Sequence, residues 1–133
     1  MMNVTNYSNL DQINLKLMVT LTRCLQSINR KEMTLFQENN LTGAQFAVLE
    51  FLYHKGPSNI KVIISSILSS GGNLTVVIDN LEKNELVERK YNEQDKRSRL
   101  ICLTDKGEKL ITEIFPKHMI NLRKILNYVN DQD

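Results

Sequence analysis

Residues 69–103, SSGGNLTVVIDNLEKNELVERKYNEQDKRSRLICL, contain the pattern that decides the fold. A turn with two glycines precedes a stretch over about 72–84, in which Val76, Val77, Ile78 and Leu81 supply the apolar positions of a short helix. Two strand-like runs follow, 86–91 and 99–103, and the polar residues between them predict a β-hairpin. We refer to residues 86–103 as the wing, because a small hairpin after such a helix is typical of winged helix-turn-helix proteins.

The residues before this stretch predict three further helices. Residues 10 to about 37 carry apolar side chains at three- and four-residue spacing, without an interrupting glycine or proline. A second helix starts at Thr42, where Gln45 completes a capping-box pattern, and it stops at Gly56. A third helix, about 60–68, leads into the glycine turn. Two helices joined by a short turn that contains glycine form a helix-turn-helix.

After the wing, the chain returns to a helical pattern. Thr104 can cap this helix, and Asp105 lies near its positive end. Apolar residues recur on both sides of Pro116, where we expect a kink or a break. The predicted fold is mainly α, an α+β winged helix-turn-helix in a single domain over 1–133. The helices 10–37 and 105–130 carry more apolar surface than one small domain covers, so we expect them to form a dimerisation region.

Composition excludes several classes of protein. With 133 residues and 41% apolar residues, the chain can form one globular core. It begins without a signal-peptide pattern, and no apolar run approaches the roughly 20 residues that span a bilayer, so we expect a cytoplasmic protein without a membrane partner. Cys24 and Cys102 are expected to stay reduced and to serve as small apolar residues, Cys24 on the apolar stripe of the first helix.

The distribution of charge points to nucleic acid more than the net charge of +2 does. From Arg89 to Arg99, five basic residues stand against two acidic ones, a local net charge of +3. A local basic patch attracts a phosphate backbone whatever the sum over the whole chain. Over 71–103, however, six basic residues balance six acidic ones. DNA binding therefore requires that Asp79, Glu82 and Glu85 lie away from phosphate, and a protein-interaction module is the alternative.

Four segments resemble the MarR family of bacterial transcription regulators. They are LTGAQFAVLEFLYHKGP (41–57), SSGGNLTVVIDNLEKNELVER (69–89), DKRSRLICLTDKGEKLI (95–111) and IFPKH (114–118). The resemblance implies a dimer with interlocked terminal helices, whose two recognition helices enter successive major grooves of DNA. It also implies small phenolic or lipophilic effectors, or oxidants. The reactive cysteine of a peroxide-sensing branch aligns here with Met18.

Two groups of residues are the candidate DNA contacts, both in a DNA-binding lobe over 42–103. Short polar side chains and glycine at the start of a recognition helix, about 72–84, suit base edges and phosphates. Basic residues at the tip of the wing suit a minor groove, where an adjacent carboxylate can hold an arginine in one orientation. The candidates are Ser70, Gly72, Asn73, Thr75, Val76 and Asn80 on the helix, and Asp95, Lys96, Arg97 and Arg99 on the wing. An ordinary capped helix and a solvated turn are the alternatives.

No pattern in the sequence supports catalysis, a metal site or a cofactor. His54 and His118 share no metal-ligand spacing with the cysteines, and no nucleophile, Walker or dinucleotide motif occurs. The sequence therefore predicts a regulator that binds double-stranded palindromic DNA as a homodimer. We expect it to be a repressor that is released by a small lipophilic or phenolic effector. The alternatives are an interaction module and a thiol-based redox-responsive regulator that uses Cys24.

Overall fold

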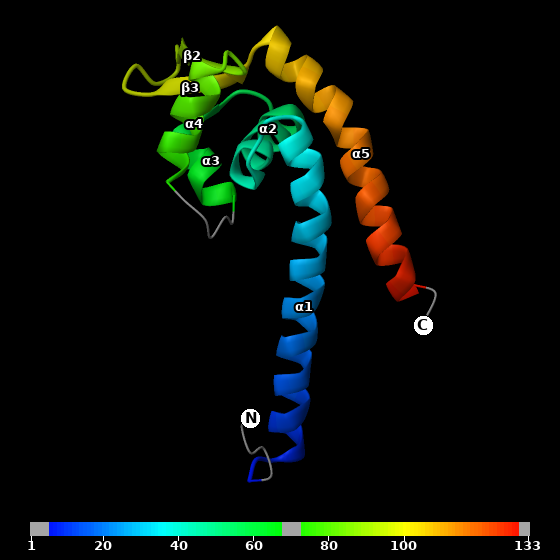
Figure 1. Cartoon of the computed structure of the whole chain (residues 1–133). Coiled ribbons are helices and arrows are strands. Elements are labelled where there is room, and N and C mark those ends of the chain that lie inside the picture. The colour runs from blue at the N-terminus through cyan, green and yellow to red at the C-terminus, as the bar shows by residue number, and fades with distance from the viewer. Residues whose placement is uncertain (1–5, 68–72, 131–133) are drawn as a thin grey trace.

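The computed structural model describes residues 6–67 and 73–130 (Figure 1). Five helices and three short strands make up these residues: α1 (Asn9–Glu38), α2 (Gly43–Lys55), β1 (Ser58–Asn59), α3 (Ile60–Ser66), α4 (Leu74–Lys83), β2 (Val87–Tyr91), β3 (Arg99–Leu103) and α5 (Asp105–Asn130). The predicted fold class, mainly α with a small β-hairpin, is confirmed.

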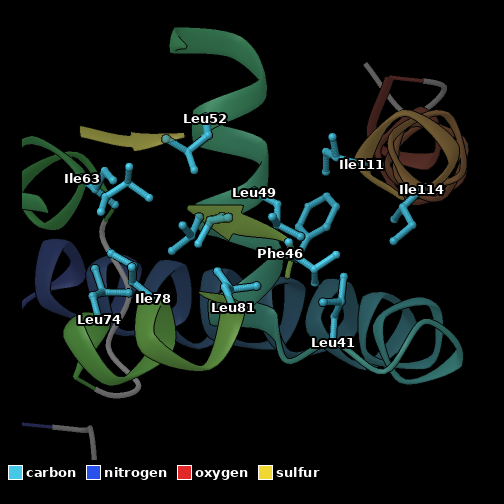
Figure 2. Close-up of a cluster of buried hydrophobic side chains, with 14 of the residues drawn as sticks. Leu41, Phe46, Leu49, Leu52, Ile63, Leu74, Ile78, Leu81, Ile111 and Ile114 are labelled. Atoms are coloured by element: carbon cyan, nitrogen blue, oxygen red, sulfur yellow. The ribbon is translucent and has the colours of Figure 1, made fainter. Parts of the chain in front are cut away.

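The lobe between the terminal helices is built around one hydrophobic core. Leu49 of α2, Ile63 of α3 and Ile78 of α4 are fully buried, and α5 adds Ile111 and Ile114 (Figure 2). Burying a side chain of this size contributes about 1.5–3 kcal/mol relative to its exposed state. The core therefore holds the helix-turn-helix segments and the start of α5 together as one unit.

Local capping explains where the first two helices begin. Ser8 and Asp11 form a capping box at α1, and the predicted box of Thr42 and Gln45 at α2 is confirmed, with the Gln45 backbone N–H donating to Thr42 Oγ1 at 3.1 Å. Between the helices Asn40 has a φ of 57°, a left-handed conformation that asparagine tolerates better than most residues. The chain therefore reverses sharply from α1 into the lobe.

The strands form a three-stranded antiparallel sheet in the order β1-β3-β2. The hairpin has the predicted strands, with Tyr91 opposite Arg99 and Val87 opposite Leu103. The short strand β1 was not predicted, because two residues show no alternation that a sequence pattern could detect. Ser58 pairs with Ile101, so β1 joins the start of α3 to the wing.

The predicted kink or break at Pro116 is wrong in its stronger form, because α5 is continuous from Asp105 to Asn130. Packing on both sides of the proline accounts for this. Ile111 and Ile114 are buried before it, and His118 packs against Phe46 of α2 after it. These contacts stabilise the helix against the lost backbone hydrogen bond and the clash of the proline ring.

Apolar residues along most of α1 are exposed. Leu10 and Ile13 are 66% and 62% exposed, whereas the buried residues of α1, Glu32 and Leu35, lie near its C-terminal end. In Figure 1 α1 extends well beyond the lobe. Cys24 lies on this part of α1 and is exposed in the single chain. The expectation that its side chain is packed is therefore wrong for the single chain. Cys102 is buried in the lobe, as predicted.

Candidate nucleic-acid interface

Helix α4 shows one buried and one exposed face. Leu74, Ile78 and Leu81 are buried, whereas the candidates Thr75, Val76 and Asn80 are exposed. Asn73 is the N-cap of α4, and its Oδ1 accepts a hydrogen bond from the Thr75 backbone N–H at 3.0 Å. The Asn73 amide nitrogen remains a donor beside this cap. The candidates Ser70 and Gly72 lie outside the described residues.

The loop of the wing is organised by its own side chains. Asn92 Oδ1 accepts from the Gln94 backbone N–H at 3.1 Å, and Asp95 Oδ1 accepts from the Arg97 backbone N–H at 3.0 Å. The sequence predicted that Asp95 would hold the Arg97 guanidinium. The structure corrects this, because the short Asp95 side chain bonds to the nearby backbone and forms an Asx turn. Asp95 therefore shapes the loop, and Lys96 and Arg97 are exposed at its end.

A basic hollow of about 500 Å³ lies between the wing and the start of α3. Its lining includes the cationic residues Lys61, Arg89, Arg97 and Arg99, and one carboxylate, Asp95. The Arg99 guanidinium lies 5.5 Å from the centre of the Tyr91 ring, within reach of a cation–π contact. The sequence did not single out Lys61, because β1, which aligns α3 with the wing, is too short to predict.

Arg89 connects the wing to α4 through two ion pairs. Its Nη2 lies 2.6 Å from Asp79 Oδ1, and its Nη1 lies 2.6 Å from Glu82 Oε1. The hydrogen bond to Asp79 raises the pKa of Arg89 above its ordinary value, although burial opposes this shift. Arg89 counted toward the predicted basic patch, but its guanidinium is engaged with Asp79 and Glu82, two of the carboxylates that were expected to lie away from phosphate. The sequence did not show this pairing, since it joins a helix to a strand.

A second polar cluster lies where the lobe meets the terminal helices. His118 Nδ1 of α5 lies 2.9 Å from Glu32 Oε2 of α1, and His118 Nε2 lies 3.9 Å from Glu50 Oε1 of α2. Glu32 is buried, and its Oε1 has no hydrogen-bond partner among the described residues. His118, isolated in the sequence, is thus part of the contact between three helices. In the described part of the chain, no group of three or more His, Cys, Asp or Glu residues could hold a metal ion.

Comparison with known proteins identifies the family. A model of the family described as transcriptional regulator SarA/Rot matches residues 30–114. The HTH-type transcriptional regulator MhqR of Bacillus subtilis is 35% identical over 119 residues, which cover 90% of this chain and 82% of MhqR. The chain belongs to the SarA/Rot family of transcriptional regulators.

Solved structures agree with the fold of this SarA/Rot-family member. A MarR-like regulator from Bacillus cereus superposes with a TM-score of 0.78 at 19% identity, over 87% of this chain and 84% of that one. BpsR from Bordetella bronchiseptica gives a TM-score of 0.73 at 22% identity, over 84% of each chain. The predicted resemblance to MarR regulators is confirmed.

The SarA/Rot-family chain is accordingly a DNA-binding transcriptional regulator of the MarR-like winged-helix type, and not an enzyme. Within residues 6–67 and 73–130, no helix is both long enough and apolar enough to span a bilayer.

Proposed function

We propose that this regulator is a repressor that binds a palindromic duplex operator as a homodimer, with α4 in the major groove and the wing along the adjacent backbone or minor groove. The observation that carries the proposal is that the exposed face of α4 and the wing lie on the same side of the lobe. In Figure 1, α3, α4 and the hairpin lie on the side of the lobe away from α5. This side offers short polar groups on α4 and, around the wing hollow, the cationic residues Lys61, Arg97 and Arg99, whereas Arg89 pairs with Asp79 and Glu82. Base edges and phosphates require these two kinds of group, respectively.

A homodimer follows from the exposed apolar residues of the terminal helices. Leu17, Leu21 and Leu25 of α1 are each more than half exposed, and Ile120 and Leu126 of α5 are nearly half exposed. Leu17, Leu21 and Leu25 are four residues apart and therefore share one face of α1, and exposed apolar side chains gathered in this way favour a protein interface. Two-fold pairing along α1 and α5 would cover it and would present two copies of α4 to half-sites about 34 Å apart.

A small effector that reduces DNA binding completes the proposal. The solved structure of BpsR, which shares the fold, is described as showing regulation of its DNA binding by 6-hydroxynicotinic acid. We expect a small aromatic or lipophilic ligand to act on this chain in a comparable way. Such a ligand must bind the conformation that does not fit DNA more tightly than the one that does.

Selection of duplexes from a random pool, followed by footprinting, tests the proposal. We expect a protected site with two-fold symmetry, and an affinity that falls as salt rises because phosphate contacts release counterions. Arg97→Ala should weaken binding to selected and random duplexes by a similar factor and reduce the salt slope by about one. Lys109→Ala, which removes an exposed cation from α5, is the matched control and should change neither.

Two results would contradict the proposal. The absence of any enriched duplex would favour the interaction-module alternative. An asymmetric footprint would contradict the homodimer on the operator. A screen of phenols and quinones then addresses the effector separately: DNA affinity that none of them changes would remove the effector and leave the DNA-binding proposal intact.

A further inference from the structure

We infer that Arg89 acts indirectly in DNA binding, by neutralising Asp79 and Glu82 on α4. This inference rests on the proposed function, since it concerns how α4 approaches DNA. It answers the difficulty that the charge balance of residues 71–103 raises, because six acidic residues there offset six basic ones.

The two carboxylates lie on one face of α4. Asp79 and Glu82 are three positions apart, a spacing that places side chains beside each other on a helix. They are 52% and 42% exposed, so without a partner they would present two negative charges to any phosphate that approached α4. The exposed candidate Asn80 lies between them in the sequence, on the helix proposed to enter the major groove.

The geometry of the contact suits arginine in particular. Each terminal nitrogen of Arg89 serves a different carboxylate, both at 2.6 Å, so one planar group spans the pair. The side chain is 27% exposed, less than either carboxylate, and it comes from β2 opposite Ile101 of β3. A lysine carries one compact charge and cannot reproduce this two-pronged geometry. Arg89 therefore neutralises part of the charge on α4 and ties the helix to the hairpin.

Substitutions of Arg89, Asp79 and Glu82 change the net charge at this contact in defined steps. The three residues carry a net −1 with Arg89, −2 after Arg89→Ala, +1 after Asp79→Asn with Glu82→Gln, and 0 when all three are replaced. At low ionic strength an uncompensated negative charge on α4 repels each nearby phosphate, and several phosphates contribute. At low ionic strength we expect Arg89→Ala to weaken binding to a duplex selected by the wild type about 5- to 10-fold.

The experiment compares six proteins on that duplex and on a random duplex, over a range of salt concentrations. They are the wild type, Arg89→Ala, Arg89→Gln, Arg89→Lys, the double variant D79N/E82Q and the triple variant R89A/D79N/E82Q. Neutralisation predicts that the triple variant recovers to within about twofold of the wild type with an unchanged salt slope. It also predicts that Arg89→Lys lies between the wild type and Arg89→Ala. Arg89→Gln keeps an amide donor, so the inference stays testable where Arg89→Ala fails to fold, as judged by circular dichroism.

Three outcomes would overturn the inference. A triple variant as weak as Arg89→Ala, with a salt slope lower by about one, would show that Arg89 itself contacts a phosphate. Unchanged binding by folded Arg89→Ala and Arg89→Gln would show that the two carboxylates stay far from DNA. A wild type that binds no duplex would overturn the proposed function and this inference with it, whereas the first two outcomes leave the proposed function standing.

Discussion

Truncating two exposed leucines of α1 should dissociate the proposed dimer. Leu17 and Leu21 are 54% and 60% exposed, so a partner could still cover somewhat more than half of each side chain. Full burial of a leucine contributes about 1.5–3 kcal/mol, and covering the remaining part contributes about 1 kcal/mol or slightly more. Two-fold symmetry counts each substitution twice. The Leu17→Ala, Leu21→Ala double variant should thus lose about 4 kcal/mol of association free energy, or about 1,000-fold in the dimer Kd.

Sedimentation equilibrium over nanomolar to micromolar concentrations measures this loss directly. Ile64→Ala is the matched control, because Ile64 is also an exposed apolar residue, 46% exposed, but lies on α3 in the lobe. The control should keep the wild-type Kd, and circular dichroism should show that both variants keep their helices. The reasoning is refuted by a double variant that dimerises as tightly as the control, or by a wild type that sediments as a monomer throughout.

Three further predictions concern the lobe and the cysteines. Gly107→Ala should lower the free energy of unfolding by about 2 kcal/mol or more, because the added Cβ would lie 2.0 Å from the Leu86 carbonyl oxygen, and chemical denaturation would measure it. In the monomeric Leu17→Ala, Leu21→Ala variant at neutral pH, iodoacetamide should modify exposed Cys24 well before Cys102, since burial raises the pKa of the Cys102 thiol and its thiolate forms only at higher pH; equal rates by mass spectrometry would contradict this. Asn73→Ser should keep the helix cap but lose the amide donor, so specific binding should weaken while thermal stability stays near that of the wild type, and an equal loss on random DNA would exclude a base contact.

Much of the fold was predictable from local signals. The box of Thr42 and Gln45 and the alternation of the two hairpin strands each involve residues close together in the chain, so a pattern of residue types detects them. Pro116 shows the limit of such patterns, because its effect depends on packing before and after it in α5. Cys24 shows the same limit, since an apolar stripe on a helix does not reveal whether the same chain or a second chain covers it.

The candidate site was predictable in its residue types but not in its pairing. The sequence identified a basic wing and an acidic stretch on the helix before it, yet it assigned Arg89 to the patch facing phosphate. In the structure Arg89 faces Asp79 and Glu82. Likewise His118 meets Glu32, which lies 86 positions away. Such long-range contacts depend on how helices and strands pack, and one sequence alone contains no periodic signal for them.

Because α1 is long, a small change in its tilt displaces the lobe at its end by several ångströms. Its 30 residues form an uninterrupted rod about 45 Å long, with the lobe attached at one end. In the proposed dimer the two helices meet around Leu21, about 25 Å from the lobe, so a tilt of about 10° there would displace each lobe by about 4 Å, more than the rise of about 3.4 Å between successive base pairs. Two recognition helices must match grooves about 34 Å apart, so a change of this size separates a pair that fits DNA from one that does not. A ligand would therefore need to adjust only the angle at which the rods meet, while the folded interior of each lobe stays unchanged.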